Sequence, residues 1–511
     1  MERKLKILFT SDVHGCFTDT DYATGLPCRR GICRCMPLYE PDGNTLILDG
    51  GDVLQGSPLT YFMHKPPKTY EPLAAAIFNL AGYRFVTLGN HDFNYGRETL
   101  EAYLAGLDAV CLSANVQGVR GTKRTAVATL QNGLRVGLTG ITTHFVNVWE
   151  RPEHLQGVTV TDAFEGAKAA LEELRAQGTD LNVCIYHGGF ENDVASGKKL
   201  SDTGENQGWR ICTELGYDVL LTGHQHNPLS DLCISGTYTC QAPHNAAGFI
   251  EMHVSVSDAG AVSASSRIRS AGDMPDEKAL ALFADAEKDV KAWLDRPVGQ
   301  LDLPLQPESH LRMALFGSPI SNFFNQVQLE ASGADISSTC LPNEVQGLEK
   351  TVTIRNIVSA YIYPNTLKVI EVRRNVLKAA LERCAEYFTV DGSTGRISDA
   401  FTVPKAEHYN YDYFSGITVR YDLTRPVGDR VRSIRYHGSE LPEDLPLRLC
   451  LNNYRATGTG GYPLFASCPV LWESQTEIVE LIMDYVEKHG SIQVDPTRWI
   501  RVAPADLALS E

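Results

Sequence analysis

The stretch Phe85-Val86-Thr87-Leu88-Gly89-Asn90-His91-Asp92 joins an apolar run to a polar tetrad. The apolar half has the length and composition of a buried strand, and the glycine marks the point where the strand gives way to a loop. An Asn carbonyl oxygen can bind a cation, the neighbouring His can act on a substrate, and the Asp can orient that His. The tetrad alone is a weak signal, so its meaning depends on the rest of the chain.

Apolar runs of strand length recur through the first half of the chain, with amphipathic stretches between them. The predicted strands are Leu5–Phe9, Thr45–Leu48, Phe85–Leu88, Ala109–Leu112, Val136–Ile141, Asn182–Tyr186 and Val219–Leu221. The predicted helices are Tyr70–Ala81, Arg97–Ala105 and Asp162–Gln177. This alternation predicts an α/β layered domain, a class that places ligands at the ends of its strands.

The second half also alternates between the two kinds of segment. Pro275–Asp295 has apolar residues at helical spacing and ends at Arg296-Pro297, so we predict a connecting helix. Beyond it we predict helices at Leu311–Val327, Ile354–Ala360 and Asn375–Tyr387, and strands at Leu367–Val372, Gly416–Tyr421 and Leu447–Leu451. We therefore predict a first domain at residues 1–272, a connecting helix at 273–297 and a mixed α/β domain at 298–511.

Length and charge narrow the classes of partner. A chain of 511 residues is too long for one ordinary core, which favours two domains. The net charge is −16 and no block of Lys and Arg is present, which argues against binding nucleic-acid polymers. Small anionic substrates are still allowed, because a metal site can neutralise their charge locally. No stretch approaches the ~18 apolar residues of a membrane span, so we predict no membrane partner.

The thirteen cysteines bear on the compartment. An odd number scattered through both halves fits a reduced cytosol better than a disulfide framework. The first residues show neither the apolar segment nor the cleavage site of a secretory signal, so we predict a cytoplasmic protein; a leader removed beforehand would instead mean the periplasm or cell surface. The cluster Cys28, Cys33 and Cys35, with Cys16 nearby, is interpreted as free thiols in a loop, with a zinc site as the alternative.

Five polar stretches follow predicted strands. They are Ser11-Asp12-Val13-His14-Gly15, Asp49-Gly50-Gly51-Asp52, Gly89-Asn90-His91-Asp92, Tyr186-His187-Gly188-Gly189 and Thr222-Gly223-His224-Gln225-His226. Residues two apart in extended backbone point the same way, as in the pairs Asp12/His14 and His224/His226. Oxygen and imidazole ligands from five strand ends suit two divalent metal ions, and manganese, zinc, iron and cobalt all accept them. A bridging carboxylate can hold two such ions roughly 3.5–4 Å apart.

In this order the motifs D-x-H, GD, GNH(D/E), H-x-G and GHxH resemble the signature of the calcineurin-like metallophosphoesterases, from residue 5 to about residue 255. The resemblance implies a four-layer α/β sandwich for the first domain. It implies one metal on Asp12, His14, Asp52 and His226, and a second on Asp52, Asn90, His187 and His224, with Asp52 bridging. A metal-activated water would attack phosphorus in line, while His91 stabilises the transition state or protonates the leaving oxygen.

The tetrad departs from those relatives that pair this His with an Asp three residues later. Asn94 occupies that position here. Asp92 is then the remaining nearby carboxylate that could orient His91 as a second catalytic residue. Alternatively, His91 has no charged partner, and both interpretations stay open.

The second half resembles the substrate domain of the 5′-nucleotidase family, and more narrowly that of bacterial 2′,3′-cyclic-nucleotide 2′-phosphodiesterase/3′-nucleotidases. The residues that carry this are Ala334-Asp-Ile-Ser-Ser, Tyr361-Ile-Tyr-Pro-Asn-Thr-Leu, Tyr409-Asn-Tyr-Asp-Tyr-Phe-Ser-Gly and Asn452-Asn-Tyr-Arg-Ala-Thr-Gly. The resemblance implies that Tyr409 and Tyr454 clamp a base by stacking; simple packing of both rings is the alternative. Asn453 could add a polar contact.

Two features of the 5′-nucleotidase pattern are missing. Ser337-Ser-Thr-Cys-Leu-Pro has no counterpart of the substrate-binding arginine, and Gly460 stands where an Asp binds the ribose hydroxyls. Both losses favour a ribose whose 2′,3′ edge carries the phosphate. We therefore predict two-metal hydrolysis of nucleotide phosphoesters, with 2′,3′-cyclic nucleotides and 3′-nucleotides as substrates. The alternatives are a 5′-nucleotidase or nucleotide-sugar diphosphatase and, more remotely, a non-catalytic protein that binds nucleotide and metal.

Overall fold

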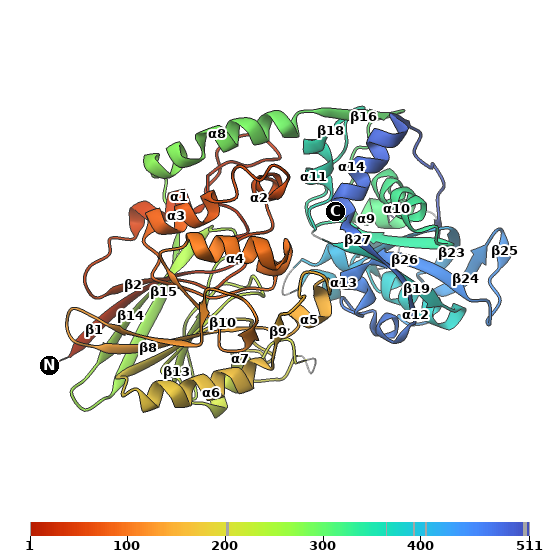
Figure 1. Cartoon of the computed structure of the whole chain (residues 1–511). Coiled ribbons are helices and arrows are strands. Elements are labelled where there is room, and N and C mark those ends of the chain that lie inside the picture. Colours follow the sequence, from red (N-terminus) through yellow and green to blue (C-terminus); the bar gives the residue numbers. More distant parts are fainter. Residues whose placement is uncertain are drawn as a thin grey trace. The chain divides into compact units, whose positions relative to one another are not determined.

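The computed structural model describes residues 2–200, 204–363, 365–391, 394–403, 406–503 and 508–509. The chain forms two compact units, Met1–Lys291 and Ala292–Glu511 (Figure 1). The border falls inside α8 (Glu277–Leu294), within the segment predicted to connect two domains. Among the helices of the described residues, none combines the length and apolar composition that crossing a membrane requires.

Two sheets form the centre of the first unit. One contains β1 (Arg3–Thr10), β2 (Thr45–Asp49), β3 (Phe85–Val86), β4 (Val110–Leu112), β6 (Thr122–Lys123), β14 (Gly248–Val256) and β15 (Val262–Ser270), in the order β15-β14-β1-β2-β3-β4-β6. The other contains β7 (Thr125–Thr129), β8 (Arg135–Thr142), β10 (Leu181–His187), β11 (Val219–Thr222), β12 (Leu229–Ile234) and β13 (Thr237–Gln241), in the order β12-β13-β11-β10-β8-β7. The strands β1 to β4 run parallel, as do β8, β10 and β11.

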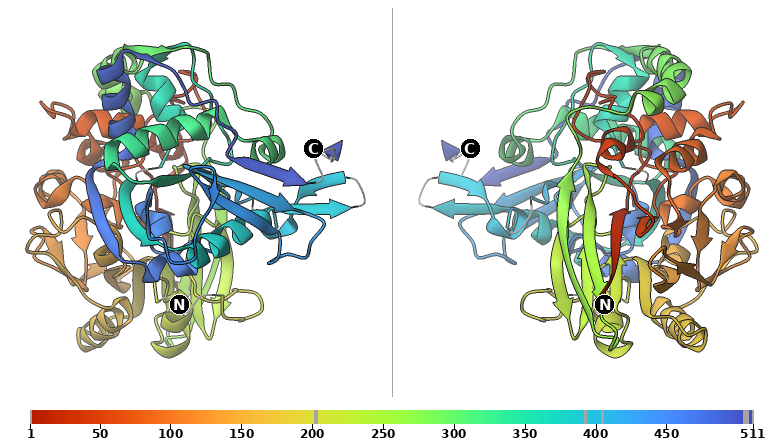
Figure 2. Two further views of the ribbon diagram at one scale, coloured as in Figure 1. Left: turned by 90° about the vertical axis from the view of Figure 1, so that its right-hand side faces the viewer. Right: turned by 90° about the vertical axis from the view of Figure 1, so that its left-hand side faces the viewer.

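The two sheets pack face to face. Ile7 and Phe9 of β1 lie in one buried cluster with Val183 and Ile185 of β10. Helices cover the outer faces: α3 (Leu73–Ala81) and α4 (Gly96–Gly106) lie over the first sheet, while α6 (Ala163–Ala176) and α7 (Gly208–Glu214) lie over the second (Figures 1 and 2). This is the four-layer α/β sandwich that the resemblance implied. The prediction of its fold class is confirmed.

Helix α8 packs on the first unit along a regular apolar stripe. The buried residues of its part in the first unit are Ala279, Phe283, Ala286 and Val290. The ring of Phe283 lies 5.5 Å from that of Phe17. The carboxylate of Glu287 accepts hydrogen bonds from Thr18, Thr20 and Tyr22.

The second unit is a mixed α/β structure, as predicted. Its largest sheet has the order β22-β17-β26-β19-β27 and contains β17 (Ile336–Cys340), β19 (Thr366–Val372), β22 (Asp412–Ser415), β26 (Leu447–Asn452) and β27 (Val470–Glu477). A four-stranded sheet contains β23 (Ile417–Asp422), β24 (Val431–Tyr436), β25 (Ser439–Glu440) and β29 (Ile500–Ala503). The small strands are β16 (Pro297–Leu301), β18 (Thr351–Thr353), β20 (Phe388–Asp391), β21 (Thr394–Ile397), β28 (Ser491–Ile492) and β30 (Ala508–Leu509). Pro364, inside one of the quoted motifs, lies outside the described residues.

The helix predicted at Leu311–Val327 is wrong in one respect, because the structure has two helices there. These are α9 (His310–Phe316) and α10 (Pro319–Ser332). Gly317 ends α9 with a φ of 88°, and the Ser318 side chain caps α10 by accepting a hydrogen bond from the Ser321 N–H. Pro319 occupies the first turn of α10, where its missing N–H costs nothing. The apolar spacing continues through this break, which is why periodicity alone reads it as one helix.

The remaining helices are short or lie near the expected positions, except for the twelve-residue helix α14 (Ile478–His489), which was not predicted from the sequence. They are α1 (Ile32–Cys35), α2 (Pro58–His64), α5 (Val146–Trp149), α11 (Ile354–Ala360), α12 (Arg374–Ala385), α13 (Asn453–Ala456) and α14 (Ile478–His489), with 3₁₀ turns η2 (His91–Phe93) and η4 (His408–Asn410) among others. Strands β5 (Val116–Gln117) and β9 (Thr159–Val160) form a separate pair.

Candidate metal centre

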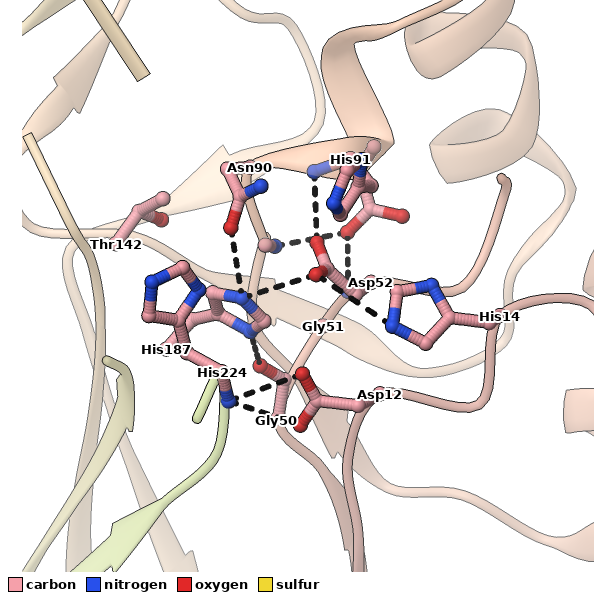
Figure 3. A network of polar contacts seen from close by, with 12 residues as sticks. Asp12, His14, Gly50, Gly51, Asp52, Asn90, His91, Thr142, His187 and His224 are labelled. Carbon is pink, nitrogen blue, oxygen red and sulfur yellow. Dashed lines mark hydrogen bonds and ion pairs between the residues drawn. The ribbon is translucent and has the colours of Figure 1, made fainter. Parts of the chain in front are cut away.

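The seven predicted metal ligands lie where strands of the two sheets end. Asp12 and His14 follow β1, Asp52 follows β2, Asn90 follows β3, His187 ends β10, and His224 and His226 follow β11. Within each sheet these strands are parallel neighbours, so their carboxyl ends lie at one edge. The two sheets together bring seven side chains, widely separated in sequence, to one place. Figure 3 labels all of them except His226.

Asp12, His14 and His226 form a first group whose ligand atoms lie within 4.8 Å of one another. The Nε2 atoms of His14 and His226 are 3.0 Å apart, and Nε2 of His226 lies 3.4 Å from Oδ1 of Asp12. The Nδ1–H of His14 donates to the carbonyl of Gln55 at 2.8 Å. Its Nε2 lone pair is therefore left to face the group, the form in which imidazole binds a metal.

Asp52, His187 and His224 form a second group of the same compactness. Nε2 of His187 lies 3.2 Å from Oδ2 of Asp52 and 3.1 Å from Oδ1 of Asn90, while its Nδ1–H donates to the carbonyl of Gly50 at 2.7 Å (Figure 3). Asn90 thus joins this group, as the resemblance implied.

Asp52 lies between the two groups. Its Oδ2 is 3.2 Å from Nε2 of His187 in the second group and 3.9 Å from Nε2 of His14 in the first. Its Oδ1 accepts the backbone N–H of His91 at 2.7 Å. A carboxylate in this position can bridge two ions.

Backbone conformation is strained at this place. Among the described residues twelve non-glycine residues have positive φ, and five of them belong to the site. These are Asp12 (55°), His14 (50°), Asp52 (59°), His224 (69°) and His226 (54°). Left-handed backbone costs an L-residue of this kind roughly 1–2 kcal/mol. Such a concentration of strain is typical of a site whose side-chain directions are set by function.

The charges of the site fit cations. Burial lowers the pKa of His14 to about 4, which keeps this ligand neutral. Burial would also lower the pKa of His187, but the charges of Asp52 and Asp12 raise it to about 10. Without a cation, a proton on His187 would thus balance the buried carboxylates. The donor set of carboxylate, amide and imidazole therefore fits two divalent metal ions.

His91 lies at the edge of this centre, with its ring 5.4 Å from that of His14. Its Nδ1 is 2.7 Å from Oδ1 of Asn94. The Asp92 carboxylate makes no hydrogen bond to His91. It accepts the backbone N–H groups of Asp52 at 3.0 Å and of Gly89 at 2.8 Å. It also accepts those of Val53 and Leu54. Asp92 thus fixes the backbone around Asp52, and the ring nitrogen of His91 turns to Asn94.

Three further residues stand beside the centre without having been predicted. Oε1 of Glu205 lies 3.0 Å from Nε2 of His224, the ring of Trp149 stacks on His224 at 5.4 Å, and the ring of His244 stacks on His226 at 4.5 Å. Glu205 lies in a loop and Trp149 on the short helix α5, so neither has a strand-end pattern. His244 follows β13, a strand that was not predicted, so a polar residue after this strand was the one signal available.

Comparison with known proteins adds independent information. Residues 5–228 match the family model of the calcineurin-like phosphoesterases, and residues 298–467 match that of the 5′-nucleotidase C-terminal domain. A Staphylococcus aureus protein assigned provisionally as a 5′-nucleotidase has a crystal structure that superposes with a TM-score of 0.86 at 30% identity, covering 98% of this chain and 100% of that one. The chain belongs to the 5′-nucleotidase family of calcineurin-like phosphoesterases.

Curated relatives agree with this family. The 2′,3′-cyclic-nucleotide 2′-phosphodiesterase/3′-nucleotidase of Haemophilus influenzae is 24% identical over 588 residues, which cover 98% of this chain and 87% of that enzyme. The trifunctional nucleotide phosphoesterase YfkN of Bacillus subtilis is 24% identical over 593 residues, but the chain spans only 39% of its length. This member of the 5′-nucleotidase family is a metal-dependent phosphoester hydrolase with a dinuclear metal centre.

The predicted substrate residues of this family member lie together in the second unit. Tyr409 is half-buried on η4, and Tyr454 on α13 is 42% exposed. The carbonyl of Tyr409 accepts a hydrogen bond of 2.7 Å from Arg455, the residue that follows Tyr454, so the segments that carry the two tyrosines lie side by side. Burial raises the pKa of Tyr409. Asn453 accepts the backbone N–H of Thr366 at 3.2 Å through its side-chain oxygen.

A buried arginine explains one departure from the family pattern. Arg455 is 1% exposed and forms an ion pair of 3.0 Å with Asp412. Its guanidinium also donates to the carbonyl of Tyr409 at 2.7 Å. A Cβ at Gly460 would lie 2.0 Å from Nη1 of Arg455 and 2.3 Å from Oδ1 of Asn410, so both side chains would have to shift to admit an aspartate there.

All thirteen cysteines are free thiols. The loop interpreted from sequence for the cluster near the N-terminus is wrong in part, because Cys33 and Cys35 lie buried on α1. In the part of the chain that the structure describes, the residue groups able to hold a metal are the two at the strand ends. The zinc alternative at the cysteines near the N-terminus finds no support.

Proposed function

We propose that this enzyme hydrolyses 2′,3′-cyclic nucleotides to 3′-nucleotides and then removes the 3′-phosphate. The observation that carries the catalytic part is the pair of ligand groups joined through Asp52, with His91 beside them. We assign one ion to Asp12, His14, Asp52 and His226, and the other to Asp52, Asn90, His187 and His224.

The metal pair would supply an activated water and neutralise phosphoryl oxygens. Hydrogen bonds within the chain orient the residues that would hold the two ions. The carbonyls of Gln55 and Gly50 hold the Nδ1 protons of His14 and His187, which directs both Nε2 atoms at the centre. Asp92 holds the backbone from which Asp52 projects, so the bridging carboxylate needs no reorganisation when substrate binds.

His91 would act on the leaving oxygen. Its Nδ1 is occupied by Asn94, so Nε2 is the nitrogen left for the substrate. When the P–O2′ bond of a cyclic phosphate breaks, an Nε2–H of protonated His91 would pass its proton to O2′. The same transfer to O3′ would accompany removal of the 3′-phosphate, and in each round one water supplies the oxygen that phosphorus gains.

Base recognition is proposed for the second unit. Two tyrosine faces on separate elements, here η4 and α13, can stack on a purine or pyrimidine for about 1–3 kcal/mol per base, with little preference among bases. Arg455 donates to the carbonyl of Tyr409 and follows Tyr454 in sequence, so one buried side chain would hold both elements in place. Asn453 would add a polar contact through its amide nitrogen, because its oxygen is used by Thr366.

The position of the phosphate follows from what the second unit lacks. Because residue 460 is a glycine, whose surroundings would have to shift to admit a side chain, no carboxylate is available there for free 2′ and 3′ hydroxyls. This supports a substrate whose 2′,3′ edge carries the phosphate, as does the name of the Haemophilus influenzae relative. The name of the Staphylococcus aureus protein supports a 5′-nucleotidase as second candidate. Thirteen unpaired cysteines support a cytoplasmic location.

A substrate panel tests the proposal. The purified protein, supplied in turn with manganese, zinc, iron or cobalt, is assayed for kcat/KM on 2′,3′-cAMP, 3′-AMP and AMP. We expect the first two to be turned over well and AMP poorly, and chelation to abolish all activity. AMP as much the best substrate would replace the proposal by the second candidate.

A further inference from the structure

Nδ1 of His91 belongs to a chain of partly buried hydrogen bonds. Nδ1 of His91 lies 2.7 Å from Oδ1 of Asn94, and Nδ2 of Asn94 donates to Oε2 of Glu150 at 2.5 Å. Oε1 of Glu150 accepts the backbone N–H of Arg151 at 2.7 Å and lies 2.8 Å from Nδ1 of His154. The four side chains come from η2, from its end at Asn94, and from the segment after α5.

The polarity of this chain has one solution. Both oxygens of the Glu150 carboxylate accept hydrogen bonds, so the amide of Asn94 must turn its NH₂ group to Glu150. Its carbonyl oxygen then faces His91, and because that oxygen can only accept, Nδ1 of His91 must carry a proton. Among the described residues no hydrogen bond reaches Nε2 of His91, so this nitrogen is left open.

The carboxylate of Glu150 is almost completely removed from solvent and is held by several hydrogen-bond partners. Its side chain is 4% exposed, and that of His154 is 23% exposed. A carboxylate removed from water must be satisfied by donors, and here Asn94, Arg151 and His154 surround it. Removing the Glu150 carboxylate from water costs folding free energy, so we infer that it has a role beyond the structure of this loop.

We propose that Glu150 is the charged partner of His91 and acts through Asn94. The relay of His91, Asn94 and Glu150 would replace the direct His–Asp pair of relatives with a carboxylate placed one residue further away. It would fix the His91 proton on Nδ1 and direct Nε2 at the phosphoester. The proposal rests on the role proposed above for His91. Asn94 and Glu150 are positioning residues in it.

Glu150→Gln gives the sharpest test. A glutamine at this position keeps its oxygen on the Arg151 N–H and places its NH₂ group against that of Asn94, which forces the Asn94 amide to flip. The flipped amide donates to His91, so the neutral ring must move its proton from Nδ1 to Nε2. We expect E150Q to lower kcat by roughly 10- to 100-fold with little change in KM. Long-range ¹H–¹⁵N spectra of ¹⁵N-histidine-labelled protein, with His91 assigned from H91N, should show the altered tautomer.

A second substitution should reverse the first. In N94D/E150Q the introduced carboxylate can accept both the Nδ1–H of His91 and the NH₂ group of the introduced glutamine. We therefore expect this double variant to regain the Nδ1–H tautomer and most of the lost kcat. The exposed neighbour Glu153→Gln removes the same charge from the same segment and should leave both readouts unchanged. Asn94→Leu cuts the relay in a different way and should reproduce the loss of kcat seen in E150Q, which covers the case that E150Q does not fold.

Two results would overturn the relay. One is an unchanged tautomer and kcat in E150Q, as in E153Q. The other is a loss of kcat that N94D does not reverse and that is equally large with H91N present, since the effect would then not pass through His91. Because the spectra need no substrate and the kinetics can use p-nitrophenyl phosphate, a failure of the cyclic-nucleotide assignment would leave this test intact.

Discussion

Each of three histidines at the site is oriented by a hydrogen-bond partner outside the metal centre. His14 and His187 each give Nδ1–H to a backbone carbonyl, and His224 meets the Glu205 carboxylate at 3.0 Å. Such outer contacts fix the ring and its tautomer, and they raise the affinity of a metal site by roughly 10- to 100-fold in typical cases. The residues behind the ligands therefore belong to the site as much as the ligands do.

Glu205→Gln should weaken metal binding. The substitution keeps the size of the side chain but removes the negative charge beside His224, so we expect the dissociation constant of the weaker-bound ion to rise by roughly 10- to 100-fold. Equilibrium dialysis with elemental analysis measures this directly. Glu172→Gln on the exposed face of α6 is the matched control. Equal affinity in E205Q and E172Q would show that Glu205 does not act on the site.

At the scale of residues, the sequence was informative where a motif repeats at strand ends. Asp12, His14 and Asp52 could be named because glycine and alternation mark the end of an apolar run. Glu205 and Glu150 could not, because each lies in an irregular loop and reaches its partner only through the tertiary fold. The partner of His91 was likewise invisible, since Asn94 alone carries no charge and its link to Glu150 spans 56 residues.

At the scale of elements, the parallel strands position the centre and the turns after them aim the ligands. The strands of the first unit were predictable because they are continuous apolar runs buried on both faces. The break between α9 and α10 was not, because Gly317 and Ser318 interrupt the backbone without interrupting the apolar spacing. The end of α9 and the start of α10 depend on the conformation of Gly317 and the cap at Ser318, and the spacing of apolar residues does not indicate either.

Contact between α9 and η4 predicts a pH effect on the second unit. The rings of His310 and His408 stack at 4.0 Å, and the Tyr387 hydroxyl lies 2.6 Å from Nδ1 of His408. Burial and the neighbouring His310 lower the pKa of His408 to about 4, and burial lowers the pKa of His310. Unfolded histidines titrate near pH 6.5, so the unfolded chain binds more protons between about pH 6.5 and 4. Stability should therefore fall as the pH falls through this window.

His408→Asn isolates this effect. The Asn carbonyl can still accept the Tyr387 hydroxyl but cannot be protonated, so the variant should lose less stability between about pH 7 and pH 5, by on the order of 1 kcal/mol after allowance for partial solvation. Hydrogen exchange of peptides from the second unit, measured against urea, gives the opening free energies. Identical losses in wild type and H408N would contradict the assignment; His310 still titrates in both.

At the scale of the whole molecule, the proposal divides labour between the two units. The first would cut the phosphoester and the second would hold the base. Family resemblance was needed for that division, because Tyr409 and Tyr454 are two of twenty-one tyrosines and nothing in their local pattern distinguishes stacking from packing. The structure adds the hydrogen bond from Arg455, next to Tyr454, to the carbonyl of Tyr409, which brings the two segments together.

Tyr409→Ala and Tyr454→Ala test this division. Each should raise KM for nucleotides by roughly 5- to 100-fold, as expected for about 1–3 kcal/mol of lost stacking, and leave hydrolysis of p-nitrophenyl phosphate unchanged. Tyr436→Ala, on β24 of the same unit, is the control and should affect neither substrate. Equal losses on both substrates would mean that these tyrosines support the fold and do not bind the base.

The most direct test of the central claim is the course of the reaction itself. Phosphorus NMR of 2′,3′-cAMP with the metal-loaded enzyme should show the cyclic phosphate signal giving way first to 3′-AMP and then to inorganic phosphate, with no 2′-AMP. Persistence of the cyclic phosphate under conditions in which the same preparation hydrolyses AMP would contradict the account.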